Sequence, residues 1–132
     1  MAYPDQFFEK QESNAKTILV VDDDPAIGEF LVEALTMEAR YHVLFATNGT
    51  KALEITRTVI PDLFLLDYQL PGMNGLALAV HFSANSAFAS IPIVLMSANM
   101  PKVEQEKHPI NFIKKPFGLD ELLQMIEQLL AH

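Results

Sequence analysis

The sequence predicts an α/β fold, a doubly wound sheet of five parallel strands with helices on both faces. Five short apolar runs recur along the chain, and most are continuous rather than alternating, as burial on both faces of a parallel sheet requires. Segments with helical periodicity separate these runs, which is the pattern of βαβ units. The 132 residues, half of them apolar, suffice for one domain with a single core.

Each apolar run marks one expected strand. Residues 1 to 15 precede the first run and are mostly polar, so we interpret them as an N-terminal extension and residues 16 to 132 as the folded domain. The expected strands are Ile18 to Val21, Val43 to Ala46, Leu63 to Leu66, Ile91 to Met96 and Phe112 to Ile113.

Helical patterns lie between the strands. The first helix is expected to begin with Asp24 as its N-cap and Pro25 at its first position. Its apolar face comprises Ile27, Phe30, Leu31, Ala34 and Leu35. Further helices are expected from about Gly49 to Thr58, from Gly75 to about Phe82 and from Leu119 to Leu130, where the last has a clear amphipathic stripe.

The segment between the last two strands departs from this pattern. Asn99 to Pro109 contains prolines at 101 and 109 and has almost no apolar face. We therefore expect a shortened or irregular fourth helix there.

Composition excludes several classes of protein. The chain has no cysteine, so disulfides and thiolate chemistry are excluded. A net charge of −8 and nine scattered basic residues argue against a surface that binds nucleic acid directly. No apolar run approaches the length of a membrane span, and the first residues lack a signal pattern. We expect a cytoplasmic protein without membrane contact.

Polar residues follow four of the expected strands. Ligands of open parallel sheets gather at the carboxyl ends of the strands. Asp62 does not qualify, because it precedes its strand and lies roughly 16 Å from the other end. The residues that do qualify are Asp22, Asp23, Asp67, Ser97 and Lys115.

Three converging carboxylates favour a metal site. At about 4 Å and an effective dielectric near 20, each like-charged pair costs on the order of 4 kcal/mol. A hard divalent cation such as Mg²⁺ relieves that repulsion. Together these groups suit phosphoryl transfer. The acids would hold Mg²⁺ and one of them would act as nucleophile, while the hydroxyl and the ammonium would bind phosphoryl oxygens.

Four motifs at successive strand ends resemble those of response regulator receiver domains from two-component signalling, including the chemotaxis regulators. The resemblance covers about residues 16 to 131 and implies a flavodoxin-like strand order of 2-1-3-4-5. The motifs are Val20-Val21-Asp22-Asp23-Asp24-Pro25, Leu65-Leu66-Asp67-Tyr68-Gln69-Leu70-Pro71-Gly72-Met73-Asn74-Gly75, Leu95-Met96-Ser97-Ala98 and Lys114-Lys115-Pro116-Phe117.

The resemblance also implies a role for each residue of the site. Asp67 would accept a phosphoryl group, and Ser97 and Lys115 would bind its oxygens. Asp23 would ligate Mg²⁺ directly, Asp22 through water, and Gln69 through its backbone carbonyl. Phe112 would move inward when Ser97 follows the phosphoryl group, although a plain buried aromatic explains it equally well. Lys115-Pro116 is expected to be cis.

Several neighbouring residues have ordinary explanations. Helix capping explains Asp24. Lys114 is expected to be a solvated surface charge, because adjacent strand residues point to opposite faces and Lys115 points toward the site. Pro71-Gly72 is a turn, and Gly75 permits close backbone approach. The four histidines, His42, His81, His108 and His132, share no motif, so surface or packing roles are favoured.

The preferred function is that of a phosphoacceptor in a two-component system or phosphorelay. A histidine kinase or phosphotransfer protein would donate to Asp67, and the altered surface would serve a downstream protein target or a homodimer. Such a domain is no enzyme beyond its own phosphorylation and dephosphorylation. Two alternatives remain open: a receiver-like interaction module that is not phosphorylated, and a phosphatase of the haloacid dehalogenase type with Asp22 as nucleophile.

Overall fold

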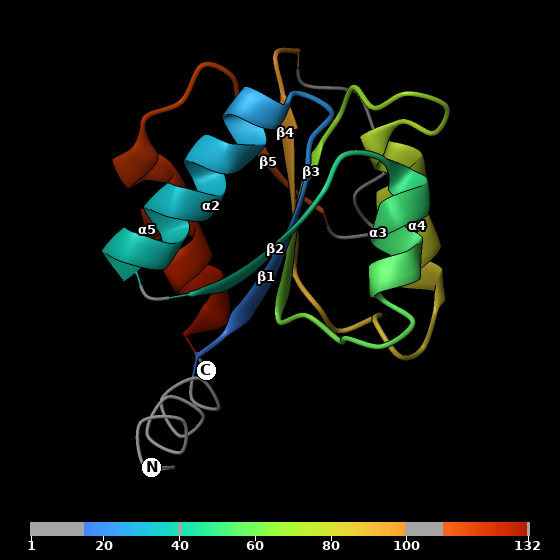
Figure 1. Cartoon of the computed structure of the whole chain (residues 1–132). Coiled ribbons are helices and arrows are strands. Elements are labelled where there is room, and N and C mark those ends of the chain that lie inside the picture. Colours follow the sequence, from blue (N-terminus) through green and yellow to red (C-terminus); the bar gives the residue numbers. More distant parts are fainter. Residues whose placement is uncertain (1–14, 40, 100–109, 132) are drawn as a thin grey trace, which may run out of the picture.

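The computed structural model describes residues 15–39, 41–99 and 110–131 and shows one sheet with the predicted fold (Figure 1). All strand pairs are parallel, in the order β2-β1-β3-β4-β5, which confirms the expected topology. Apart from Ala15 and Asn99, the expected extension and the expected fourth helix lie outside the described residues. The strands are β1 Thr17–Val21, β2 His42–Ala46, β3 Leu63–Asp67, β4 Ile93–Ser97 and β5 Asn111–Lys114.

The three central strands explain the continuous apolar runs. Every residue of β3 and β4 is buried, as are the last four residues of β1, whereas the edge strands β2 and β5 are more exposed. Strand β4 begins two residues later than predicted. Proline at 92 has no N–H to give to a ladder, and the N–H of Ile91 donates to the Phe88 carbonyl at 3.0 Å in the preceding turn.

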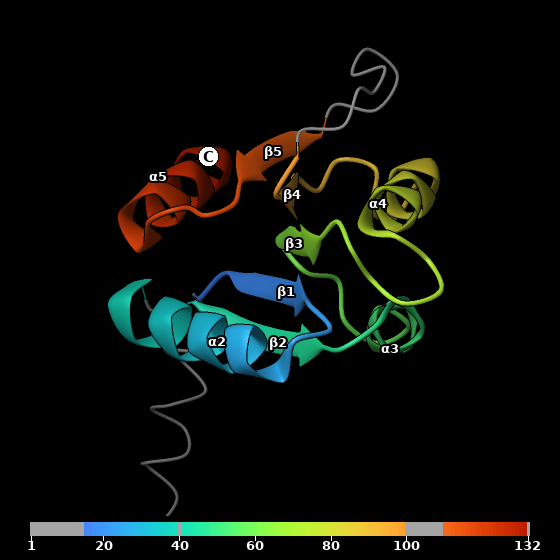
Figure 2. The ribbon, with the colours of Figure 1, turned by 90° about the horizontal axis from the view of Figure 1, so that it is seen from above.

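Two pairs of helices cover the two faces of the sheet (Figure 2). One face carries α2 and α5, and the other carries α3 and α4. Helix α5 has the predicted bounds, but α3 ends three residues earlier than predicted. The backbone N–H groups of Arg57 and Thr58 donate to the carbonyls three residues before them, as in a 3₁₀ turn, and not to those four residues before. No helix among the described residues combines the length and apolarity that crossing a membrane demands. The helices are α2 Pro25–Ala39, α3 Gly49–Ile55, α4 Gly75–Ala84 and α5 Leu119–Leu130.

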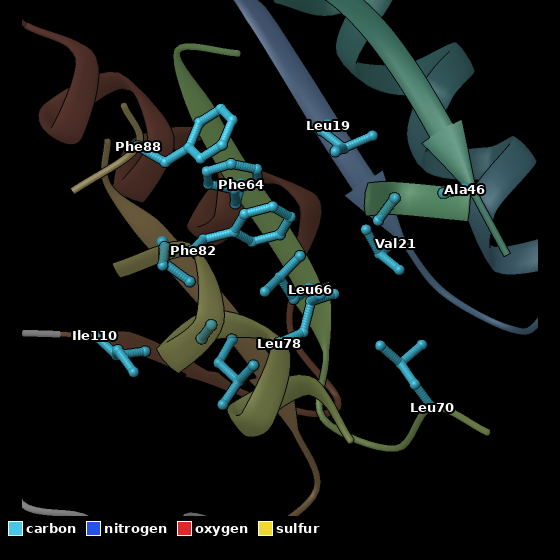
Figure 3. Close-up of a cluster of buried hydrophobic side chains, with 14 residues drawn as sticks. Leu19, Val21, Ala46, Phe64, Leu66, Leu70, Leu78, Phe82, Phe88 and Ile110 are labelled. Atoms are coloured by element: carbon cyan, nitrogen blue, oxygen red, sulfur yellow. The ribbon is translucent and has the colours of Figure 1, made fainter. Parts of the chain in front are cut away.

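The core has one part on each face of the sheet. Beneath α3 and α4, the rings of Phe64 and Phe82 stack with centroids 4.1 Å apart, and Phe88 packs edge-on against both (Figure 3). Beneath α2 and α5, a second cluster includes Leu31, Leu35, Leu122 and Ile126.

Helix α2 corrects one expectation. Ile27 and Phe30 were predicted to share its buried face, yet their side chains are 39% and 57% exposed. Phe30 lies one residue before the buried Leu31, which rotates it by about 100° around the helix axis. The buried face is therefore narrower than the run of apolar residues indicates.

Candidate functional site

Three carboxylates meet at the carboxyl end of the sheet. Asp22 and Asp23 follow β1, and Asp67 is the last residue of β3. Because Val21 pairs with Leu66, the next residues, Asp22 and Asp67, leave the sheet side by side. One oxygen from each of the three carboxylates lies within 4.8 Å of the others, with Asp22 and Asp67 buried and Asp23 exposed.

The environment of Asp22 is unfavourable for a bare carboxylate. Its Oδ1 accepts a hydrogen bond from the Asp24 N–H at 2.9 Å, but its Oδ2 is buried without a hydrogen-bond partner. Burial raises the pKa of Asp22, and the charges of Asp67 and Asp23 act in the same direction, against the Asp24 N–H and Lys115. An orphaned carboxylate oxygen beside two further carboxylates fits a hard divalent cation such as Mg²⁺.

Lys115 supplies the positive charge of the site. Its Nζ donates a hydrogen bond to Asp67 Oδ1 at 3.0 Å. The residue follows β5 directly, its backbone N–H donates to the Ser97 carbonyl at 2.8 Å, and its bond to Pro116 is cis, as predicted. Lys114 is exposed, as predicted. Only one of the two adjacent lysines therefore takes part in the site.

Ser97 ends β4 and is buried, but its hydroxyl is engaged locally. It donates to the Asn99 carbonyl and accepts from the Asn99 N–H at 3.2 Å. The Ser97 hydroxyl makes no hydrogen bond to the Asp67 or Lys115 side chain in the part of the chain that the structure describes. Next to it lies a small cavity of about 100 Å³, lined by Tyr68, Gln69, Ser97, Ala98, Asn99 and Lys115.

The loop after Asp67 folds back tightly onto β3. The Gly75 N–H donates to the Tyr68 carbonyl at 2.7 Å, and a Cβ at Gly75 would lie 2.1 Å from the Asp67 backbone oxygen. This confirms the close backbone approach predicted for Gly75. Gly72 adopts φ of 80°, which suits the predicted turn. The backbone carbonyl of Gln69 remains a predicted metal ligand.

The other residues singled out from the sequence lie outside the site. Asp62 accepts from the Thr17 N–H at 2.7 Å at the far end of β3, and Asp24 Oδ1 accepts from the Ala26 N–H at 3.0 Å as a helix cap, both as expected. Phe112 is half-buried and packs against the core beneath α3 and α4, so its role as a switch stays a prediction. His42 and His81 are exposed, and the other two histidines lie outside the described residues.

The apolar groove that lies beside the site was not predicted from the sequence. It has a volume of about 480 Å³ and shares Ala98 and Lys115 with the small cavity. The signal that could have revealed it is Phe117, an aromatic residue two positions after Lys115. The groove is lined by Ile27, Phe30, Leu31, Ala98, Lys115, Pro116 and Phe117.

Comparison with known proteins gives a consistent result. A family model described as the response regulator receiver domain matches residues 18–127. The chain is 31% identical over 132 residues to hybrid signal transduction histidine kinase D of Dictyostelium discoideum, covering 96% of the chain and 8% of the kinase. It is 36% identical over 113 residues to DNA-binding response regulator MtrA of Mycolicibacterium smegmatis, covering 83% of the chain and 48% of that protein. The chain thus spans half or less of these relatives.

Solved structures agree with the fold. A response regulator structure from Chloroflexus aurantiacus superposes with a TM-score of 0.80 at 28% identity, covering 90% of this chain and all of the other. The response regulator protein TrrA of Thermotoga maritima, crystallised in complex with Mg²⁺ and BeF, gives a TM-score of 0.76 at 32% identity, covering 86% of this chain and 98% of the other.

Proposed function

This chain belongs to the response regulator receiver domain family, and we propose that Asp67 accepts a phosphoryl group from a phosphohistidine on a partner protein. One observation carries the proposal. The Asp67 carboxylate lies within 4.8 Å of two further carboxylates and 3.0 Å from the Lys115 ammonium. A capping or turn aspartate needs neither kind of neighbour, whereas phosphoryl transfer needs both a cation site and a fixed positive charge.

Asp22, Asp23 and Asp67 would hold Mg²⁺, together with the backbone carbonyl of Gln69. The complex of TrrA with Mg²⁺ and BeF supports this assignment, because BeF imitates a phosphoryl group beside the metal. When bound, the ion neutralises charge on the phosphoryl oxygens and on the acids. The unpartnered Oδ2 of Asp22 is the atom in greatest need of that neutralisation.

Asp67 would act as the nucleophile. A carboxylate oxygen forms the new bond to phosphorus while the bond from phosphorus to the histidine nitrogen breaks and the imidazole leaves with the electron pair. Lys115, which already touches Asp67, turns its ammonium to the incoming phosphoryl oxygens. Because the charge already lies beside Asp67, only this small movement is needed for it to lower the barrier.

Ser97 would exchange one hydrogen-bond partner for another. Its hydroxyl leaves the Asn99 carbonyl and donates to a phosphoryl oxygen held in the adjoining cavity. That exchange frees the Asn99 turn and allows Phe112 to move inward, which changes the surface offered to a downstream protein or to a second copy. Gln69 and Asn99 flank the path of attacking water and would set the lifetime of the acyl phosphate.

The wider setting follows from the same assignment. The partners would be a histidine kinase or phosphotransfer protein and a downstream target in the cytoplasm, with residues 16 to 132 as the functional unit behind the extension at residues 1 to 15. The domain would catalyse only its own phosphorylation and dephosphorylation.

Mass spectrometry after incubation with acetyl phosphate and Mg²⁺ tests the proposal. We expect the wild type and Asp62→Asn to gain the mass of one phosphoryl group, and Asp67→Asn to gain none. Peptide mapping then locates the group. Phosphate on Asp22 would favour the phosphatase alternative, and no added mass on the folded wild type would favour the interaction module.

A further inference from the structure

The acidic loop, residues 22–24, joins β1 to α2 and carries two of the three carboxylates of the site. Its first end is tied to β2, the neighbour of β1 in the sheet. The Asp22 N–H donates to the carbonyl of Ala46, the last residue of β2, at 3.1 Å. Within the loop, the Asp24 N–H donates to Asp22 Oδ1 at 2.9 Å. The position of the Asp24 backbone therefore helps to set the orientation of the Asp22 carboxylate.

The second end of the acidic loop continues into the first turn of α2, which lies beside β2 (Figure 2). The Gly28 N–H donates to the Asp24 carbonyl at 3.0 Å, the spacing of an α-helical hydrogen bond. Gly28 also lies against the ring of Phe45, the residue before Ala46. A Cβ at Gly28 would come 2.0 Å from Cζ of that ring and 2.2 Å and 2.8 Å from its two Cε atoms. Two adjacent residues of β2 thus hold the acidic loop at both of its ends.

Glycine is unfavourable at position 28 for the helix itself. It is the weakest helix former apart from proline, and Gly28 does not adopt the positive φ that would call for glycine. The ring of Phe45 supplies the reason, since any larger side chain at position 28 would overlap it. The ring is half-buried and packs against the core beneath α2 and α5, which limits the room into which it could turn. Gly28→Ala is therefore expected to push the first turn of α2 away from β2.

We propose that Gly28 and Phe45 are a positioning pair for the metal site, in which the ring sets the distance between α2 and β2 and so the place of the acidic loop. Neither side chain can ligate a metal. The effect passes from Gly28 through the Asp24 backbone to the Asp22 carboxylate. Mg²⁺ demands nearly ideal octahedral geometry, so a small displacement of a carboxylate weakens its binding. The inference rests on the proposed function, which requires Mg²⁺ among the three carboxylates, and it adds two residues that set the affinity for the ion.

Titration calorimetry with Mg²⁺ alone tests the pair without any phosphoryl donor. The variants are Gly28→Ala, Phe45→Leu and the double variant, because leucine lacks the three ring atoms that a Cβ at position 28 would meet. Phe88→Leu is the matched control, since Phe88 packs against Phe64 and Phe82 in the core on the opposite face of the sheet. Circular dichroism and urea unfolding establish that each variant is folded under the conditions of the titration.

We expect Gly28→Ala to weaken Mg²⁺ binding about tenfold, as is usual when a group that supports a metal ligand is displaced. In the Phe45→Leu background the same substitution should tighten binding, since the added methyl fills space that the ring tip has left. The effect of Gly28→Ala therefore changes sign with the residue at position 45. Phe88→Leu should stay within about twofold of the wild type, because distant sites act independently.

An unchanged affinity in Gly28→Ala would overturn the positioning pair, because the ring would then turn aside without effect on the site. Equal weakening by Gly28→Ala with and without Phe45→Leu would overturn it too, as would a loss of the same size in Phe88→Leu. If Gly28→Ala does not fold, the double variant is compared with Phe45→Leu, and weaker binding in the double variant overturns the pair. A wild type that binds no Mg²⁺, or that acetyl phosphate does not label at Asp67, would instead overturn the proposed function.

Discussion

The two ends of β3 each carry an aspartate, and the two carboxylates have opposite effects on the fold. Asp62 accepts a hydrogen bond from the Thr17 N–H at 2.7 Å and ties the start of β3 to β1. Asp67, five residues on, lies among other carboxylates and is balanced on one side by Lys115. An aspartate that accepts a hydrogen bond from a backbone N–H stabilises the folded state. An aspartate beside other carboxylates lowers the stability of the folded state until a cation binds between them. The carboxyl end of the sheet, where the proposed site lies and which is the functional end of this comparison, is therefore expected to give up stability that the other end keeps.

The largest effect is expected from removing the counter-charge at the functional end. Lys115→Met should slow phosphorylation by acetyl phosphate about a hundredfold, because the fixed ammonium no longer stabilises the phosphoryl oxygens. Initial rates of phosphoprotein formation measure this. Lys114→Met is the matched control, since the Lys114 side chain is exposed and adjacent strand residues point to opposite faces of the sheet. Equal slowing in both variants would show that general charge, not position, matters.

Mg²⁺ should stabilise the folded protein through the functional end alone. At a concentration of a hundred times its dissociation constant, the ion is expected to raise the free energy of unfolding by about 2.7 kcal/mol. Urea unfolding with and without MgCl₂ measures the gain. Asp62→Asn should keep it and Asp23→Asn should lose most of it. A gain that survives Asp23→Asn would place the ion elsewhere.

A third difference lies in the backbone around Asp67. A Cβ at Gly75 would lie 2.1 Å from the Asp67 carbonyl oxygen, while a Cβ at Gly118 would meet nothing within 4 Å. Gly75→Ala should therefore cost about 2 kcal/mol of unfolding free energy and displace the loop. Gly118→Ala should cost less, about 0.5–1 kcal/mol, because Gly118 is the N-cap of α5 and alanine is a poorer N-cap than glycine. Urea unfolding of both variants measures the two changes in unfolding free energy. Equal losses in the two variants would mean that the loop after Asp67 moves aside without cost.

The sequence predicted most of the sheet and the acidic and basic side chains that meet at its carboxyl end, for a physical reason. A strand buried on both faces must be apolar throughout, so the sequences of β1 and β3 are easily recognised as strands. The polar residue that follows such an apolar run must then lie at the end of the strand, where the chain leaves the core. The amphipathic stripe of α5 likewise fixed its bounds without knowledge of its neighbours. The strand order came from the family resemblance, because pairing between distant segments leaves no local mark.

Three features could not be predicted because they depend on tertiary contacts. The hydroxyl of Ser97 bonds to Asn99 in a turn whose shape the residue types do not specify. The exposure of Phe30 depends on how α2 rotates against the sheet. The bond between Asp62 and the Thr17 N–H joins residues 45 positions apart. In each case the residue type was evident and its partner was not.

Asp22 gives a smaller effect with a definite dependence on pH. Burial raises its pKa above the usual 3.8, so the folded protein binds this proton more tightly than the unfolded chain does. Its contribution to stability therefore falls as the pH rises through the raised pKa, and the loss persists at neutral pH. Asp22→Asn should raise the free energy of unfolding without Mg²⁺ by about 1–2 kcal/mol at neutral pH.

Urea unfolding of wild type and Asp22→Asn, from acid to neutral pH, measures that gain. The two proteins should converge in acid, where both side chains are neutral. Saturating Mg²⁺ should reverse their order at neutral pH, since only the wild type keeps the full set of acids. A variant that is less stable than wild type without the ion would contradict the cost assigned to the buried carboxylate.

The smallest effect is expected at the other end of β3, and it separates the two kinds of aspartate. Asp62→Ala removes the acceptor for the Thr17 N–H and should cost about 1 kcal/mol, the usual net value of one hydrogen bond. Asp62→Asn keeps an oxygen in the same place and should recover most of that loss, whereas Asp67→Asn cannot recover phosphorylation. Urea midpoints measure the first pair and phosphoprotein formation the second. If Asp62→Asn were as unstable as Asp62→Ala, charge rather than acceptor geometry would matter there, and the distinction between the two ends of the strand would fail.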